Sequence, residues 1–303
     1  MTASTPPEAS SRLADFAALI ATAMIWGFNW PIVRIMLETA SPWTLRAAGL
    51  GGGALFLFLA TRASGVSLAV PRAHWPNLFL AAMFNVALFA IFTIFAQLSM
   101  PTSRAAILTF TMPLWGTLFA WAMLGEAIDG RRVVALCLGA LGLTVLALPF
   151  WPVIAAGGLP FGLVYVLGAA ISWAFGTVWL KKYPIVAAPL AVTTWQVALA
   201  AGVCTVAMLI MEKPHLDLTH KPQLLSFIYH IVLPQGVAYI LWFGLVRRLP
   251  ASTASLGTLL VPVFGVLGSI VLLDDWPTRL DVLGLGLIVA AVLIDQARPQ
   301  SRP

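Results

Sequence analysis

Hydrophobic runs of helical length follow one another along almost the whole chain. Each run has about 20 residues, enough for an α-helix to cross a hydrocarbon core of about 30 Å. Short connections separate the runs, most of them contain proline or glycine, and none is long enough to form a separate domain. The pattern predicts ten membrane-spanning helices, at about residues 15–36, 42–61, 74–98, 101–124, 131–150, 161–182, 187–211, 222–248, 251–273 and 279–296.

Two of these runs are related to each other in sequence. Residues 101–126 (PTSRAAILTFTMPLWGTLFAWAMLGE) and 250–275 (PASTASLGTLLVPVFGVLGSIVLLDD) match at eight of 26 positions when they are offset by 149. Earlier in the chain, Trp26 and Phe28 recur as Trp173 and Phe175 at an offset of 147. A repeat of about half the chain indicates an internal duplication, with one copy in residues 1–150 and the other in 151–303.

The two copies are predicted to face opposite leaflets of the membrane. Each copy holds five predicted spans, and an odd number of spans makes the second copy enter the membrane from the other side. The charges agree, since Arg247 and Arg248 precede Pro250, whereas Leu98 and Ser99 occupy the equivalent positions. The predicted fold is therefore an all-α integral membrane protein of ten transmembrane helices in two inverted five-helix repeats, one structural unit with its site between the halves.

Composition and charge support this class and predict an orientation. Of the 303 residues, 60% are hydrophobic and 9% charged, compared with about 25% charged in a soluble domain. The first run continues past Met36 without a cleavage site, so it is expected to be retained. Eleven Lys and Arg residues fall on the side of the termini, which predicts cytoplasmic termini. The six on the other side are Arg34, Arg46, Arg104, Lys213, Lys221 and Arg279.

The region from Gly236 to Asp275 carries a family resemblance. Its order of Gly-x-Ala-Tyr-x-x-Trp, a basic pair, Ala-Ser-x-Ala and Pro-Val-Phe resembles the signature of the EamA-type drug/metabolite transporter superfamily. The first copy ends on the family's Gly-Glu pair as Gly125-Glu126, whereas the second has Asp274-Asp275. The tryptophan-rich first spans and the length further resemble bacterial aromatic amino acid exporters. The resemblance implies a multi-pass transporter of the bacterial cytoplasmic (inner) membrane with a small-molecule substrate.

Polar and aromatic residues inside the spans are the candidates for a substrate site, because polar groups are costly in lipid and tend to face a cavity or another helix. Aromatic faces that carry an amide could hold a flat apolar group with a polar end. Tryptophan can instead lie in the interfacial belt, and Asn29 and Asn85 could instead join neighbouring helices. The candidates are Trp26, Asn29, Trp30, Asn85, Phe89, Phe92, Trp173, Thr177, Gln235, Tyr239 and Trp242.

Equivalent prolines in the fourth and ninth spans are candidates for hinges. Pro113 and Pro262 each remove a backbone hydrogen bond and should kink their helices, and Gly116 and Gly265 follow one turn later. Kinks at the same depth in two inverted copies would let each half bend toward its own leaflet. The alternative is a pair of static kinks that only shape the bundle.

The distribution of titratable residues narrows the function. All eleven acidic residues lie in tails, connections or span ends, and no Lys or Arg lies in mid-membrane, which argues against a strongly anionic substrate. His230 is expected to be packed or hydrogen-bonded away from Gln235, and Cys137 and Cys204 to be small packing residues. No motif for a metal, a cofactor, a phosphate or a catalytic nucleophile is present, so an enzyme is disfavoured.

The sequence thus predicts a secondary transporter that exports small neutral or zwitterionic metabolites by alternating access, with aromatic amino acids as the first candidates. An equilibrative channel or facilitator is the alternative nearest in kind. A scaffold or receptor-like role remains a further alternative, although neither it nor an enzyme explains an inverted duplication. The partners expected are the substrate and the lipid bilayer, with no nucleic acid.

Overall fold

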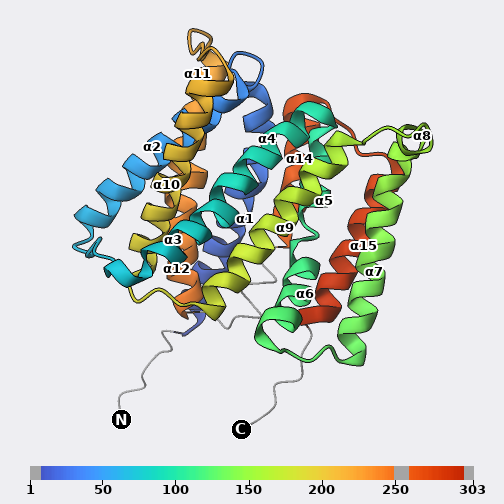
Figure 1. The fold of residues 1–303 in the computed structure, drawn as a ribbon, viewed down its shortest axis with the longest axis horizontal. Coiled ribbons are helices and arrows are strands. Elements are labelled where there is room, and N and C mark those ends of the chain that lie inside the picture. The colour runs from blue at the N-terminus through green and yellow to red at the C-terminus, as the bar shows by residue number, and fades with distance from the viewer. Residues whose placement is uncertain (1–7, 249–258, 297–303) are drawn as a thin grey trace.

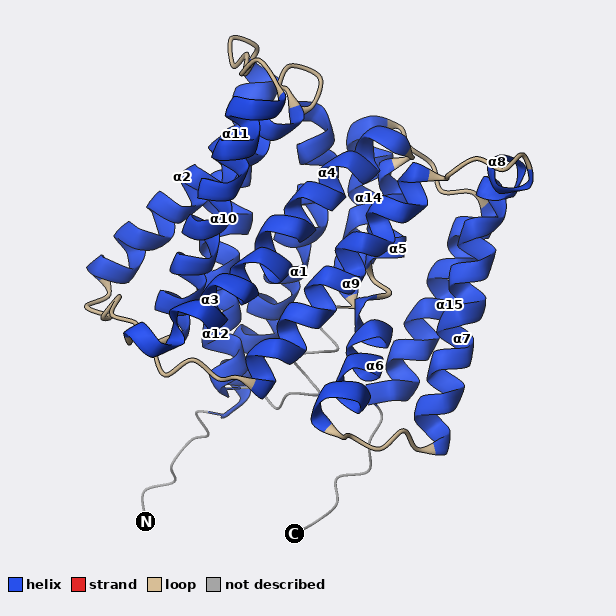
Figure 2. Cartoon of the chain, in the orientation of Figure 1, coloured by secondary structure: helices blue, strands red, loops and turns tan. Residues whose placement is uncertain are grey.

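A computed structural model describes residues 8–248 and 259–296, and all the regular secondary structure in these residues is helical (Figures 1 and 2). The elements of the first half are α1 (Glu8–Met36), α2 (Pro42–Ala63), η1 (Arg72–His74), α3 (Trp75–Ala81), η2 (Ala82–Leu88), α4 (Phe89–Ser99), α5 (Thr102–Thr109), α6 (Met112–Leu124), α7 (Gly130–Ala147) and η3 (Leu148–Phe150). Those that follow are α8 (Trp151–Ala155), α9 (Phe161–Lys182), α10 (Pro189–Met211), α11 (Lys221–Val232), η4 (Leu233–Val237), α12 (Ala238–Arg248), α14 (Leu260–Leu273) and α15 (Arg279–Gln296).

The described helices confirm an all-helical membrane architecture. Among the described residues, eight helical stretches are long and apolar enough to cross a membrane, and they coincide with the first eight predicted spans. The ninth predicted span is represented by the 14 residues of α14, because part of it lies outside the described ranges. The tenth corresponds to α15, whose 18 residues include Arg279, Asp281 and Asp295. The total of ten spans therefore stays a prediction.

Each main contact between two helices has a counterpart in which the equivalent helices of the two halves trade places. Helix α2 packs against α10, and α7 packs against α15 at the edge of the bundle in Figure 1. Helix α1 packs against α14, and its counterpart α9 packs against α6. Likewise α9 contacts η2 and α4, whereas α1 contacts α11 and α12. Each main interface thus joins an element before residue 150 to an element after it, so neither half folds around a core of its own.

Two π-helical turns occupy equivalent places in the third and eighth predicted spans. The first is η2 and the second is η4, whose bounds minus 149 give 84–88, inside η2. A π-turn widens the helix by one residue and is frequent at functional sites. The two amides that the sequence singled out, Asn85 and Gln235, lie in these turns.

The fourth predicted span is broken in two immediately before Pro113. Helix α5 ends at Thr109, α6 begins at Met112, and Phe110 and Thr111 donate backbone hydrogen bonds to residues three positions earlier. Pro113 has no N–H to offer Thr109, so the α-helical ladder is interrupted where the proline would require it. The sequence predicted a kink at this point, and the structure shows a complete interruption of the helix.

The Asp274-Asp275 pair, which stands where the first half has Gly125-Glu126, reproduces the left-handed end of the helix and also supplies a carboxylate. Gly125 and Asp274 end α6 and α14 in the left-handed conformation, with φ of 69° and 53°. The Asp274 carboxylate accepts a hydrogen bond from Trp276 Nε1 at 2.7 Å. Asp275 accepts hydrogen bonds from the backbone nitrogen and hydroxyl of Ser103 at 2.9 and 3.0 Å. The second-half carboxylate therefore caps the first turn of α5 in the first half.

Candidate functional site

Three of the candidate residues form one aromatic group between the halves. The Trp26 ring on α1 lies 5.8 Å from the Tyr239 ring and 5.7 Å from the Trp242 ring, both on α12, measured between centroids. Trp26 Nε1 also donates to the carbonyl oxygen of Pro234 in η4 at 3.2 Å. We call Trp26, Tyr239 and Trp242 the first aromatic group. All three residues are half-buried, so part of each ring remains accessible for stacking.

A second aromatic group occupies the equivalent interface of α4 and α9. The Phe89 and Trp173 rings lie 4.9 Å apart between centroids. Phe92 contacts the same helix further along, with its ring against Gly168 and 6.4 Å from the Tyr165 ring. We call Phe89, Phe92 and Trp173 the second aromatic group. Because Trp173 is the repeat partner of Trp26, each half contributes one tryptophan to an aromatic contact with the other half.

The two asparagines that were proposed for the site make contacts between helices. Asn29 Oδ1 lies 2.7 Å from Nδ1 of His230, which is 1% exposed, so this pair joins α1 to α11. The Asn85 side chain packs against Gly176 of α9, and its buried Oδ1 has no hydrogen-bond partner among the described residues. The sequence left open whether these amides line a cavity or join helices; Asn29 makes a hydrogen bond between helices, whereas Asn85 makes only a packing contact within the described part of the chain.

The remaining candidates are placed apart from one another. Trp30 is 8% exposed and packs in a core with Ala106 and Val266, away from the first aromatic group. Thr177 is exposed, and its hydroxyl donates to the Trp173 carbonyl oxygen at 2.9 Å. Gln235 packs against Gly53 of α2. Helix α2, which contributed no candidate in the sequence analysis, therefore borders the amide of the second half.

Arg46 on α2 is a buried cation that the sequence analysis missed. It was counted with Arg104 among the cations on the side opposite the termini, but the two residues are only 5% and 8% exposed. Arg46 Nη2 donates to Thr93 Oγ1 on α4 at 2.9 Å. A cation within about a turn of a helix end can usually extend to the membrane surface, so sequence position alone did not reveal this burial. The polar interior of the bundle therefore includes a guanidinium.

The two proposed hinge glycines have different surroundings. A Cβ atom added at Gly116 would have nothing within 4 Å, whereas one added at Gly265 would lie 3.1 Å from Ala106. Pro262 is buried and is the third residue of α14, and Pro113 is the second residue of α6. The backbone around Gly116 therefore has free space on its side-chain face that the backbone around Gly265 lacks.

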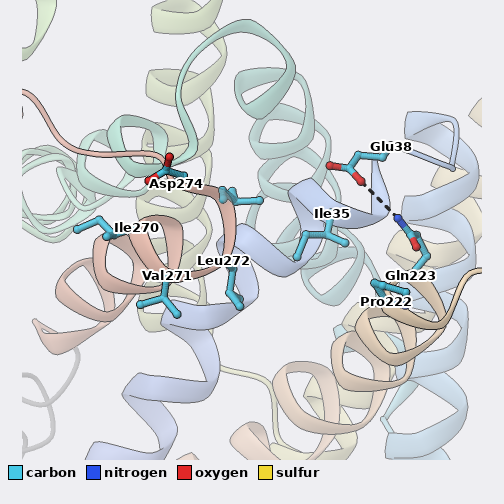
Figure 3. Close-up of a pocket in the computed structure, with 9 residues that line it drawn as sticks. Ile35, Glu38, Pro222, Gln223, Ile270, Val271, Leu272 and Asp274 are labelled. Carbon is cyan, nitrogen blue, oxygen red and sulfur yellow. Dashed lines mark hydrogen bonds between the residues drawn. The ribbon is translucent and has the colours of Figure 1, made fainter.

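A cavity of about 620 Å³ lies where the ends of α1 and α14 meet the start of α11 (Figure 3). Gln223 Nε2 donates to Glu38 Oε2 at 3.3 Å on one side of it, and Asp274 lies across from this pair. None of the sequence-predicted site residues lines it. Its lining residues are Ile35, Glu38, Pro222, Gln223, Ile270, Val271, Leu272, Leu273 and Asp274.

Ion pairs hold the ends of the helices on both sides of the bundle. Arg104 on α5 donates from Nε to Asp281 Oδ1 of α15 at 2.6 Å. At the opposite end of the fourth predicted span, Glu126 accepts from Lys181 at 2.6 Å and from Arg132 at 2.9 Å. The hydrogen bond from Lys181 holds the pKa of the Glu126 carboxyl below its usual value. Among the described residues, no three His, Cys, Asp or Glu side chains lie close enough to hold a metal ion.

One protein-family model matches the chain twice, in agreement with the internal duplication. The model of the EamA-like transporter family matches residues 13–148 and matches again at residues 160–294. The chain belongs to this family. It is accordingly a multi-pass membrane protein of a bacterial transporter family, and two copies of the EamA unit make up most of its length.

Several curated transporters are similar to this EamA protein over nearly their whole length. The uncharacterized transporter YvbV of Bacillus subtilis is 28% identical, over 94% of this chain and 93% of its own. The probable amino-acid metabolite efflux pump of Escherichia coli is 25% identical, over 93% of this chain and 94% of its own. One crystal structure aligns with 92% of this chain and 96% of its own at a TM-score of 0.65 and 21% identity, which shows a shared fold.

Proposed function

We propose that this EamA-family protein is a secondary carrier that exports small neutral or zwitterionic metabolites by alternating access. The observation that carries the proposal is the pair of matched aromatic groups. In each group a tryptophan from the first helix of one half meets aromatic rings from the third helix of the other half. Such a contact must slide or reorient when the halves rock, so a flat substrate that stacks on it can be bound differently in the two states.

The proposed ground plan is two inverted five-helix repeats, residues 1–150 and 151–303. It is supported by the offset of 149 residues that relates η4 to η2. It is also supported by the helix interfaces, since each main interface between the halves has a counterpart formed by the equivalent helices. The π-turns and the broken fourth span add irregular backbone inside the bundle. In inverted-repeat transporters, irregular backbone near the midplane is where substrate contacts are made.

Aromatic amino acids are the substrates we propose first. Stacked rings suit a flat apolar side chain, and buried polar groups beside them suit its charged end. The name of the Escherichia coli efflux pump, which refers to amino-acid metabolites, points to the same class of substrate. Another relative, YedA of Escherichia coli, is named as an inner membrane transporter, in line with an inner-membrane location for this chain. The Lys and Arg distribution supports cytoplasmic termini.

Expression of the protein is expected to protect cells from toxic aromatic amino-acid analogues and to lower the intracellular level of the analogue. Purified protein in liposomes should then catalyse saturable counterflow of labelled phenylalanine, because a carrier exposes one site to one side at a time. Flux that rises linearly with concentration and shows no counterflow would instead indicate a channel. Unchanged resistance to aromatic and other neutral amino-acid analogues alike would contradict the substrate assignment.

The hinge proposal predicts opposite effects of two proline substitutions on which side of the membrane is open. Pro113→Ala and Pro262→Ala each restore a backbone donor and stiffen one half, so each should favour a different facing state. Cysteine accessibility from the two sides of the membrane measures the bias. Gly116→Ala is a sharp companion variant, because the added methyl group meets no atom within 4 Å. A loss of flux in Gly116→Ala would then come from the backbone and not from a clash.

Equal accessibility and normal flux in both proline variants would remove the prolines from the mechanism. The kinks would then be static features that shape the bundle.

A further inference from the structure

The guanidinium of Arg46 is buried in the bundle without a counter-charge. The residue is 5% exposed, and its one hydrogen bond to a side chain goes to the neutral hydroxyl of Thr93 at 2.9 Å. Its Nε has no partner among the described residues. Arginine offers five N–H donors in a planar fork that fits a carboxylate, and most of that capacity is unused here.

None of the acidic side chains that the structure describes supplies the missing charge. The ion pairs within 4.0 Å involve Arg104, Arg131, Arg132 and Lys181, and none involves Arg46. The titratable groups that interact electrostatically with Arg46 are Cys204 and His230. A thiol and an imidazole carry no negative charge at neutral pH. Arg104, which is also buried near the start of its helix, shows the contrast because it is paired with Asp281.

Arg46 is joined to α4 about one helical turn from Phe89 of the second aromatic group. Its partner Thr93 is four residues after Phe89 on α4, and the Thr93 hydroxyl donates to the Phe89 carbonyl oxygen at 2.8 Å. On α2, Gly49 and Gly53 follow Arg46 at helical spacings of three and seven residues and contact His230 and Gln235, respectively. Gln235 is four residues before Tyr239. One face of α2 thus runs from the guanidinium to Gln235 in η4, one turn before Tyr239 of the first aromatic group, while Thr93 links the guanidinium to the second aromatic group.

A permanent unpaired cation in this environment is unfavourable, because removing a charge from water is costly unless another charge compensates for it. The compensation need not come from the protein. A carboxylate of the substrate would pair with the fork of Arg46 through charge-assisted hydrogen bonds while an aromatic side chain stacks on the neighbouring rings. A neutral substrate would leave the cation unpaired.

We infer that Arg46, held by Thr93, is the binding site for the carboxylate of the transported molecule. The inference rests on the proposed carrier function and narrows it from neutral or zwitterionic metabolites to substrates that carry a carboxylate. An aromatic amino acid has this group, whereas its amide and its amine do not. Arg46 is therefore a specificity-determining residue.

The test compares phenylalanine with phenylalaninamide in counterflow by the full-length protein in liposomes. The intact protein is expected to bind phenylalanine about 10- to 100-fold more tightly than the amide, the range of one or two charge-assisted hydrogen bonds. Arg46→Gln should lower the apparent affinity for phenylalanine by a similar factor and leave that for the amide within about threefold. Arg46→Lys keeps the charge but loses the planar fork, so its affinity for phenylalanine should lie between that of the unmodified protein and that of Arg46→Gln.

Arg34→Gln is the matched control, because Arg34 is half-buried and donates only to the Gln97 carbonyl oxygen at 3.4 Å. Its selectivity should equal that of the unmodified protein. Equal losses for acid and amide in a folded Arg46→Gln protein would overturn the inference and make Arg46 a structural cation. Absence of selectivity in the unmodified protein would overturn it as well.

A binding measurement separates this inference from the proposed function. The melting temperature of the purified protein is measured with phenylalanine, phenylalaninamide and 3-phenylpropanoate, since a ligand that binds the folded state raises it. The site is supported if both carboxylates raise the melting temperature of the unmodified protein, if Arg46→Gln abolishes this shift, and if Arg46→Lys reduces it. This result would support the site even if counterflow is absent and the carrier proposal fails. No shift of the unmodified protein with either carboxylate would overturn the site. If Arg46→Gln does not fold, the Arg46→Lys protein is measured in its place: a smaller shift with the carboxylates supports the site, and an unchanged shift overturns it.

Discussion

Arg104→Met is expected to destabilise the folded protein by about 3–5 kcal/mol, because it leaves the Asp281 carboxylate buried without its cation. The pair is bidentate, with Nε to Oδ1 at 2.6 Å and Nη2 to Oδ2 at 3.0 Å. The two side chains are 10% and 3% exposed, so water does not replace the lost partner. The effect would be measured as the shift of the thermal or denaturant unfolding midpoint of the purified protein.

Two further variants show whether the loss comes from the uncompensated charge. The double variant Arg104→Met with Asp281→Leu should recover most of the stability, since replacing a whole buried ion pair by apolar groups is often nearly neutral. Lys181→Ala is the control for an exposed pair. Lys181 is 65% exposed at its side chain, so its removal should cost less than about 1 kcal/mol. A cost of the same size in Arg104→Met and Lys181→Ala would show that burial does not decide the strength of these pairs.

Gly27→Ala is expected to force α1 and α14 apart and to reduce both folded yield and transport. A Cβ atom at this position would lie 2.8 Å from the carbonyl oxygen of Val261 and 2.9 Å from the nitrogen of Gly265, and it would also meet Phe264. Two of these atoms belong to the backbone, which cannot move aside as a flexible side chain can. Overpacking costs about 1–3 kcal/mol, and we expect the upper end of this range here.

Gly51→Ala is the control for this substitution, because an added Cβ at Gly51 meets no atom within 4 Å. It should be neutral, or more stable by up to about 1 kcal/mol from its better helix propensity. Fluorescence-detected size exclusion reports the folded yield and a melting curve reports the stability. A Gly27→Ala protein that matches Gly51→Ala in both measurements would contradict the close approach of α1 and α14.

The sequence alone accounts for the class of the fold and most of its elements. Each of the eight helical stretches that can cross a membrane coincides with a predicted span, because burial in lipid requires a continuous apolar run that is legible residue by residue. The duplication can be recognised in the sequence because matching residues recur at a nearly constant offset. Where the residues differ, as at Gly125 and Asp274, the structure still has equivalent left-handed helix ends.

The sequence was less informative about the break before Pro113. A proline in a helical pattern predicts a missing hydrogen bond, but whether the helix bends or stops depends on what the freed groups contact. In the structure, Phe110 and Thr111 turn back to Ile107 and Leu108, and the chain restarts as α6. These local bonds decide the outcome, and the hydrophobic pattern does not encode them.

What the sequence by itself determined is where the chain crosses the membrane, that it does so twice with the same plan, and which residue types are available to bind a substrate. Only the tertiary structure decided which of those residues meet. A membrane helix is apolar on its lipid face and on its packed face alike, so its sequence has no clear polar side from which the interior can be inferred. Trp26 and Trp30 therefore look equivalent in sequence but pack in different places, and Arg46 resembles a surface cation until α4 is placed beside it.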